Sequence, residues 1–108
     1  MINNKKIKIF LAGVGGMLGE AFYNQFKENY ILKCTDIDVN EDWLTFLDFR
    51  DEAAYHKQVK EFDPDYLFHI GAFTDLEYCE VHEKDTYETN TKSVEYAVNI
   101  ANSLNIKL

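Results

Sequence analysis

An apolar run that leads directly into a cluster of glycines is the feature that most constrains how this chain can fold. The stretch is LAGVGGMLGEAF, residues 11–22, with four glycines between Gly13 and Gly19. Glycine costs backbone entropy inside regular structure, so such a cluster needs a local reason. Residues 6–12 (KIKIFLA) are typical of a buried strand, and residues 16–28 have the apolar spacing of a helix. The glycines therefore form the turn between a strand and a helix.

The rest of the chain continues this alternation. We expect strands at 30–35, 43–47 and 66–70, and helices at 50–62 and 83–104. The inward stripe expected for the last helix comprises Tyr87, Asn90, Thr91, Val94, Ala97, Val98, Ala101 and Leu104. Strands that alternate with helices predict a parallel sheet covered on both faces, here a Rossmann-type doubly wound α/β fold. A new apolar run opens at Ile106, so we expect the chain to be a fragment of a longer domain.

Composition narrows the classes of function. Apolar residues make up 46% of the 108, as in globular proteins, and the net charge of -8 argues against partners such as nucleic acid or a membrane surface. The chain has no signal-peptide pattern and no apolar stretch as long as a membrane span. Cys34 and Cys79 fit no metal-ligand spacing. We therefore expect a cytoplasmic protein without a metal site.

The glycine spacing suggests what the turn does. The pattern is Gly13-x-x-Gly16-x-x-Gly19. In a dinucleotide-binding turn the first glycine permits the tight turn, the second lets a phosphate approach, and the third lets helix and sheet pack closely. The start of the helix supplies free amide donors and the positive end of the helix dipole, which favour a pyrophosphate. The alternative is a strand–helix turn that binds no ligand.

An acidic residue at the end of the second strand is the next requirement of a dinucleotide site, and Asp36 meets it. Its carboxylate can accept both ribose hydroxyls of an adenosine. It would also repel a 2′-phosphate, by roughly 1 kcal/mol in water and about 4 kcal/mol at an effective dielectric near 20. The sequence therefore favours NAD as cofactor and leaves NADP open. The alternative is a solvated acidic loop, which describes Asp38, Glu41 and Asp42 better than Asp36.

Taken in order, the motifs resemble those of a known family. They are GVGGMLG, then Asp36, then Asp48-Phe49 after the third strand, then HIGAFTDLEYCE after the fourth, and finally Tyr87-x-x-Asn90. The chain from Lys6 to Leu108 resembles the N-terminal part of the extended short-chain dehydrogenases/reductases, closest to the dTDP-4-dehydrorhamnose reductase group. The resemblance implies that residues 1–108 are the N-terminal portion of an NAD(P)-binding Rossmann domain.

The resemblance also assigns cofactor contacts. Asp36 would bind the adenosine ribose, and Asp48 and Phe49 would flank the adenine. Three residues would lie against the pyrophosphate: Gly16, Met17 and Leu18. Four would line the nicotinamide-side ribose: Gly71, Ala72, Phe73 and Thr74. For Asp48 a helix N-cap or loop acid remains an equal alternative, as does a core aromatic for Phe49 and a packing role for Met17.

Catalytic residues are mostly expected elsewhere. In the family the residue matching Asn90 holds a water in the proton relay behind the catalytic lysine; the alternative is an asparagine that bonds a neighbouring backbone group. The catalytic tyrosine and lysine are expected beyond Leu108, so this chain alone is expected to be inactive. Tyr23-x-x-x-Lys27 has the right spacing but lies in the first helix, and we assign it no chemistry. His69 ends a buried strand and is expected to be structural.

The resemblance implies the function of the whole protein: an NAD(P)-dependent reductase that transfers hydride to the C4 carbonyl of a nucleotide-linked keto sugar. The alternatives are a nucleotide-sugar epimerase or dehydratase that uses NAD, and a non-catalytic regulatory subunit of the same fold. A methyltransferase is a third reading, which Gly19 and the HIGAFT segment argue against. A nucleotide sugar is the expected small-molecule partner, and a homodimer is left open.

Overall fold

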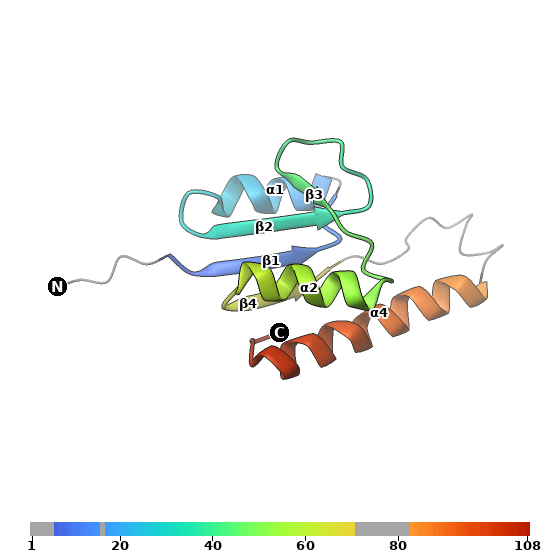
Figure 1. Ribbon diagram of the computed structural model, residues 1–108. Helices are drawn as coiled ribbons and strands as arrows, with labels where there is room; N and C mark the ends of the chain where they lie inside the picture. The colour runs from blue at the N-terminus through green and yellow to red at the C-terminus, as the bar shows by residue number, and fades with distance from the viewer. Residues whose placement is uncertain (1–5, 16, 71–82) are drawn as a thin grey trace.

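The computed structural model describes residues 6–15, 17–70 and 83–108, with side chains described for 6–15, 19–70 and 91–108. Within these residues one parallel sheet contains β1 (Lys8–Ala12), β2 (Ile31–Asp36), β3 (Leu44–Phe46) and β4 (Tyr66–His69). The helices in the same ranges are α1 (Met17–Phe26), α2 (Glu52–Phe62) and α4 (Glu83–Leu104). The strand order is β3-β2-β1-β4 (Figure 1). The predicted Rossmann-type α/β architecture is therefore confirmed.

The central strand β1 is buried on both faces. Ile9 and Leu11 belong to a core cluster on the α1 side, with Phe22 and Tyr23 of α1 packed against it. Phe10 and Ala12 belong to the cluster on the opposite side, which α2 and α4 cover (Figure 1). Burial on both faces explains why residues 9–12 of β1 are a continuous apolar run without alternation.

The inward stripe predicted for α4 is partly wrong. Val94 and Val98 are 47% and 38% exposed, whereas the buried residues of the helix are Ala97 and Ala101 of the predicted stripe together with Ser93 and Ile100. Small serine and alanine side chains let α4 lie close to α2 and β4, so the helix turns these residues inward. Ala97 and Ala101 were predicted correctly, and the side chains of Tyr87 and Asn90 lie outside the described residues.

The outer edge of β4 meets the end of the chain. Lys107 forms an isolated parallel bridge with Tyr66, and the Lys107 carbonyl accepts a hydrogen bond from the Leu67 N–H at 2.8 Å. The apolar run that opens at Ile106 therefore lies beside β4 as a further parallel segment. In the described part of the chain, no helix combines the length and apolar character needed to cross a membrane.

Candidate functional site

The candidate site lies at the carboxyl ends of β1, β2 and β4. The chain leaves β1 toward β2 on one side, whereas β4 lies on the other side of β1. In open α/β sheets, ligands bind beyond the carboxyl ends of the strands at this point of reversal. The glycine turn between β1 and α1 starts here, so the sheet topology and the glycine pattern indicate the same place.

The first part of the glycine turn is attached to the end of β2. Gly13 has φ 77°, in the left-handed region that favours glycine. The N–H groups of Gly13 and Val14 donate to the Thr35 carbonyl at 2.8 and 3.1 Å. The buried Thr35 hydroxyl donates in turn to the Leu11 carbonyl at 2.8 Å. Thr35 was not singled out from the sequence, because its burial and its contacts arise only in the folded sheet.

Gly19 lets α1 pack closely against that turn. A Cβ atom at Gly19 would lie 1.5 Å from the carbonyl oxygen of Val14, so no side chain fits there. This close approach is what the third glycine was expected to provide. Gly16 lies outside the described residues. Met17 and Leu18 open α1, and their side chains are not among those described.

Gly15 and Asp36 form the contact that joins the turn to the predicted ribose site. The Gly15 N–H donates to Asp36 Oδ2 at 2.8 Å, and the Asp38 N–H donates to Asp36 Oδ1 at 3.0 Å. A Cβ atom at Gly15 would lie 2.8 Å from the Asp36 carboxyl carbon, so a larger residue would displace the carboxylate. Gly15 was missed as a site residue, although it belongs to the glycine cluster, because it lies outside the Gly13-x-x-Gly16-x-x-Gly19 spacing.

The Asp36 carboxylate has the capacity that an adenosine ribose requires. An ionised carboxylate offers about four acceptor positions on its two oxygens. The N–H groups of Gly15 and Asp38 each use one of them, on different oxygens. Counting the donors among the described residues, each oxygen therefore retains a lone pair, which suits the two adjacent hydroxyls of a ribose. The residues present fit a dinucleotide whose pyrophosphate lies at the start of α1.

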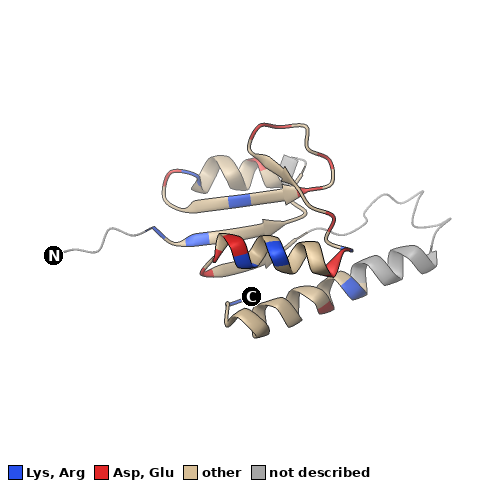
Figure 2. Cartoon of the chain, viewed as in Figure 1, with Lys and Arg blue, Asp and Glu red and all other residues tan. Residues whose placement is uncertain are grey.

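Further acidic residues follow Asp36 in the chain. Figure 2 shows them along the loop between β2 and β3, which contains Asp38, Glu41 and Asp42. All three side chains are exposed. Their charge disfavours an additional phosphate next to Asp36, in the same direction as Asp36 itself.

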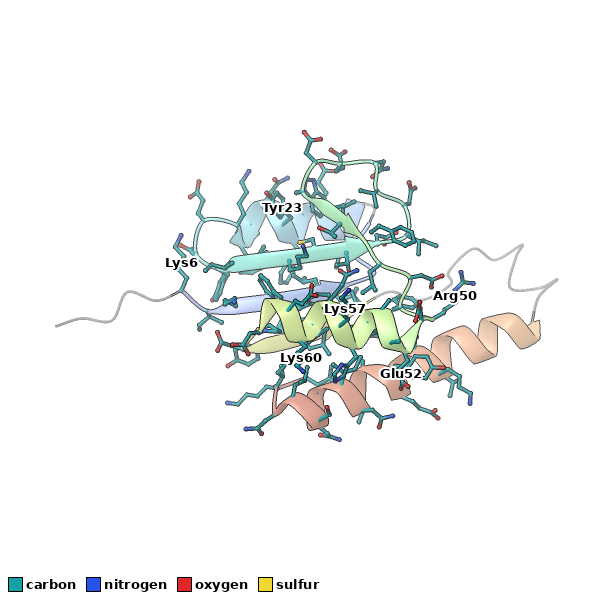
Figure 3. All side chains as sticks on the ribbon, in the orientation of Figure 1. Lys6, Tyr23, Arg50, Glu52, Lys57 and Lys60 are labelled. Atoms are coloured by element: carbon teal, nitrogen blue, oxygen red, sulfur yellow. The ribbon has the colours of Figure 1, made fainter. Side chains whose placement is uncertain are left out.

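Asp48 forms an ion pair with Arg50, which is labelled in Figure 3 just before α2. Arg50 Nε donates to Asp48 Oδ1 at 2.9 Å, and its terminal nitrogen donates to Oδ2 at 2.8 Å. These side-chain hydrogen bonds, with one from the Arg50 backbone N–H, hold the pKa of Asp48 below its usual value, although partial burial opposes them. The N-cap of α2 is Asp51, so the helix-cap alternative for Asp48 is wrong, and Asp48 lies in the loop between β3 and α2.

Phe49 packs on the interior beside Asp48. Its ring lies 4.8 Å from the His69 ring, centre to centre, and it contacts the core cluster on the α2 side. The core-aromatic reading therefore describes its present packing. A role for Phe49 or Asp48 at an adenine stays a prediction.

The remaining predicted residues fall into two groups. Gly71, Ala72, Phe73 and Thr74 lie outside the described residues, and the structure places Asn90 in α4 without describing its side chain. Tyr23, labelled in Figure 3, stacks on Trp43 at 4.5 Å, and Lys27 Nζ lies 5.5 Å from the centre of the Tyr23 ring. Tyr23 and Trp43 both pack against the core cluster on the α1 side, so the Tyr23–Lys27 pair has packing contacts.

Comparisons with known proteins show which fold and family the chain resembles. The family model for the RmlD substrate binding domain matches residues 7–108. No match is found among curated protein sequences. Among solved structures, dTDP-4-dehydrorhamnose reductase from Bacillus anthracis in complex with NADP superposes with a TM-score of 0.82 at 20% identity, covering 99% of this chain and 36% of that one.

Two further structures share the fold but have other activities. L-threonine dehydrogenase from Clostridium difficile gives a TM-score of 0.84 at 19% identity, covering 94% of this chain and 35% of that one. UDP-glucose 4-epimerase from Thermus thermophilus in complex with NAD gives 0.80 at 14% identity, covering 93% and 35%. The chain thus spans about a third of the length of these proteins. Identities this low show the fold and not the reaction.

Proposed function

This chain belongs to the RmlD substrate binding domain family, and from this premise we propose that residues 1–108 form the NAD(P)-binding part of a reductase for a nucleotide-linked 4-keto sugar. The family match also confirms the resemblance to the extended short-chain dehydrogenases/reductases. The observation that carries the proposal is the Gly15–Asp36 contact at the start of α1, where a glycine turn and a carboxylate with free lone pairs lie together. Because the chain spans 36% of the Bacillus anthracis reductase, the reaction is proposed for the whole protein.

Each part of the site has a proposed task. The turn from Gly13 to Gly19 exposes the amide groups at the start of α1 for the pyrophosphate, and Asp36 accepts the ribose hydroxyls. Asp48 accepts from the adenine amino group through Oδ2, which retains a lone pair beside the Arg50 contact. Asn90 and the segment 71–74 serve the nicotinamide end. When bound, a nicotinamide dinucleotide supplies the hydride that reduces a carbonyl carbon.

We propose NADH as the preferred cofactor because Asp36 would face the 2′-phosphate of NADPH. A repulsion of about 1 to 4 kcal/mol corresponds to a preference of about fivefold to several hundredfold. Fluorescence titration of the chain with NADH and NADPH measures this ratio. In Asp36→Asn, which keeps an oxygen for the Gly15 N–H, we expect weaker NADH binding and a smaller ratio.

Asp38→Asn is the matched control for this titration. It removes one neighbouring charge but keeps the backbone N–H that donates to Asp36. We expect it to leave NADH binding nearly unchanged. NADPH binding as tight as NADH binding in the unsubstituted chain would refute the role of Asp36 in cofactor choice.

The reaction itself is tested with the natural protein, at the length that its coding frame gives. A reductase consumes one NADH for each 4-keto sugar nucleotide converted, which is followed by the loss of NADH absorbance. An epimerase, which the match to UDP-glucose 4-epimerase keeps as the second candidate, interconverts sugars without net consumption of NADH. A protein that binds NADH but catalyses neither reaction would be a non-catalytic dinucleotide-binding subunit.

A further inference from the structure

Three polar side chains from three elements meet beneath the candidate site. The hydroxyl of Tyr55 in α2 lies 2.9 Å from Nδ1 of His69, the last residue of β4. His69 Nε2 lies 3.1 Å from the hydroxyl oxygen of Ser93 in α4. Tyr55 and Ser93 have 0% exposure. A single imidazole therefore connects both helices on this face to the end of a strand.

Aromatic packing fixes the plane of that imidazole. The His69 ring lies 4.8 Å from the Phe49 ring and 5.8 Å from the Tyr55 ring, centre to centre. Next to it, the Ile70 N–H donates to the Ala12 carbonyl at 3.0 Å, immediately before the glycine turn begins at Gly13. A displacement of His69 would thus be transmitted to the end of β1.

The hydrogen-bond roles follow from the chemistry of the partners. A neutral imidazole has one N–H donor and one acceptor nitrogen. Burial lowers the pKa of His69, which favours the neutral ring. A serine within a helix commonly donates to the carbonyl four residues earlier. With the proton on Nε2, Ser93 accepts from Nε2–H of His69 and the Tyr55 hydroxyl donates to Nδ1, whereas with the proton on Nδ1 both directions reverse and both contacts remain.

We propose that His69 is a positioning residue that uses the Tyr55 and Ser93 hydroxyls to hold α2 and α4 against the carboxyl end of β4, so that the edge of the sheet beside the glycine turn is preorganised for the dinucleotide. This inference rests on the proposed function. It gives His69 a role beyond the structural one expected from the sequence. Ser93 lies three residues after Asn90 on α4, so the same contact sets the position of the helix that carries Asn90.

The test measures both the NADH affinity and the free energy of unfolding of each variant, under conditions in which all the variants are folded. Tyr55→Phe and Ser93→Ala each remove one hydroxyl, and His69→Leu removes both hydrogen bonds. We expect each to weaken NADH binding by about three- to tenfold. His69→Gln should recover part of the loss, because its amide can still reach Ser93. Ile100→Val, in the same core cluster but without a polar group, should lower stability and leave NADH affinity unchanged.

Two results would overturn the inference while the proposed function stands. One is NADH affinity that follows stability in every variant, Ile100→Val included, because His69 would then be merely structural. The other is a His69 ring that nitrogen NMR finds charged at pH 7. If the unsubstituted chain fails to bind NADH at all, the proposed function fails first, and this inference fails with it.

Discussion

Asp36 closes β2 with a carboxylate that already accepts two backbone N–H groups. Those donors come from the glycine turn and from the loop that follows β2, so the carboxylate is oriented before any ligand arrives. Hydrogen bonds to an ionised carboxylate are stronger than those between neutral groups. At the residue scale, therefore, the candidate site is an acid oriented by the backbone N–H groups of Gly15 and Asp38.

His69 gives the chain a pH-dependent stability near neutrality. Burial lowers its pKa in the folded state, whereas an unfolded histidine has a pKa of about 6.5. Below that value the unfolded chain binds more protons than the folded chain. The free energy of unfolding should therefore fall as the pH drops from 7 to 5, by at most about 1.4 kcal/mol per pH unit. The lowered pKa of Asp48 affects the free energy of unfolding only at a more acidic pH than this.

Urea unfolding between pH 7 and pH 5 measures this effect. In His69→Gln the dependence should flatten, because the titrating group is gone. His56→Gln is the matched control on α2, where His56 lies 3.4 Å from the Ser103 hydroxyl. Equal flattening in both variants, or no fall in stability for the unsubstituted chain, would contradict the assignment to His69.

At the scale of elements, Gly19 decides how close α1 lies to the turn. Alanine is favoured over glycine within a helix by about 1 kcal/mol. At this position the added Cβ would collide with the Val14 carbonyl oxygen, so α1 would have to move. We therefore expect Gly19→Ala to destabilise the chain by about 2 kcal/mol or more, despite the gain in propensity. Chemical denaturation decides the sign, and a stabilised variant would mean that α1 does not pack as described.

The face that α4 presents to the core gives a second prediction. Ala97 has 0% exposure and Val94 has 47%. Ala97→Asp should cost about 3 kcal/mol or more, because it buries an unpaired charge. Val94→Asp, one turn away on the same helix, should stay within about 1 kcal/mol. Urea midpoints of the two variants make the comparison, and similar losses would show that Val94 also faces the core.

Helices α1 and α4 show how much of the fold can be predicted from local sequence. The spacing of apolar residues placed both helices within a few residues of their observed bounds, because periodicity is a property of the segment itself. The inward face of α4 depended on its neighbours, and the sequence favoured large Val94 and Val98 over small Ser93. The Tyr55–His69–Ser93 contact joins residues 14 and 24 positions apart and had no local signal.

At the scale of the whole molecule, the site depends on strand order. The glycines and Asp36 are 21 residues apart at their contact and meet only because β1 and β2 are neighbours in a parallel sheet. The sequence predicted Gly13, Gly19 and Asp36 from the spacing of a known motif. It missed Gly15 and Thr35, because their importance arises from contacts between the turn and β2 that form only in the folded sheet.

The most direct test of the central claim is an NMR titration of the labelled chain with NADH. We expect the amide signals of Gly13, Gly15, Gly19 and Asp36 to shift together, because all four surround the start of α1. S-adenosylmethionine should leave them unchanged. Shifts confined to the groove of about 580 Å³ on the α2 side, around Lys33, Lys57 and Glu61, would contradict the claim, as would no response to NADH.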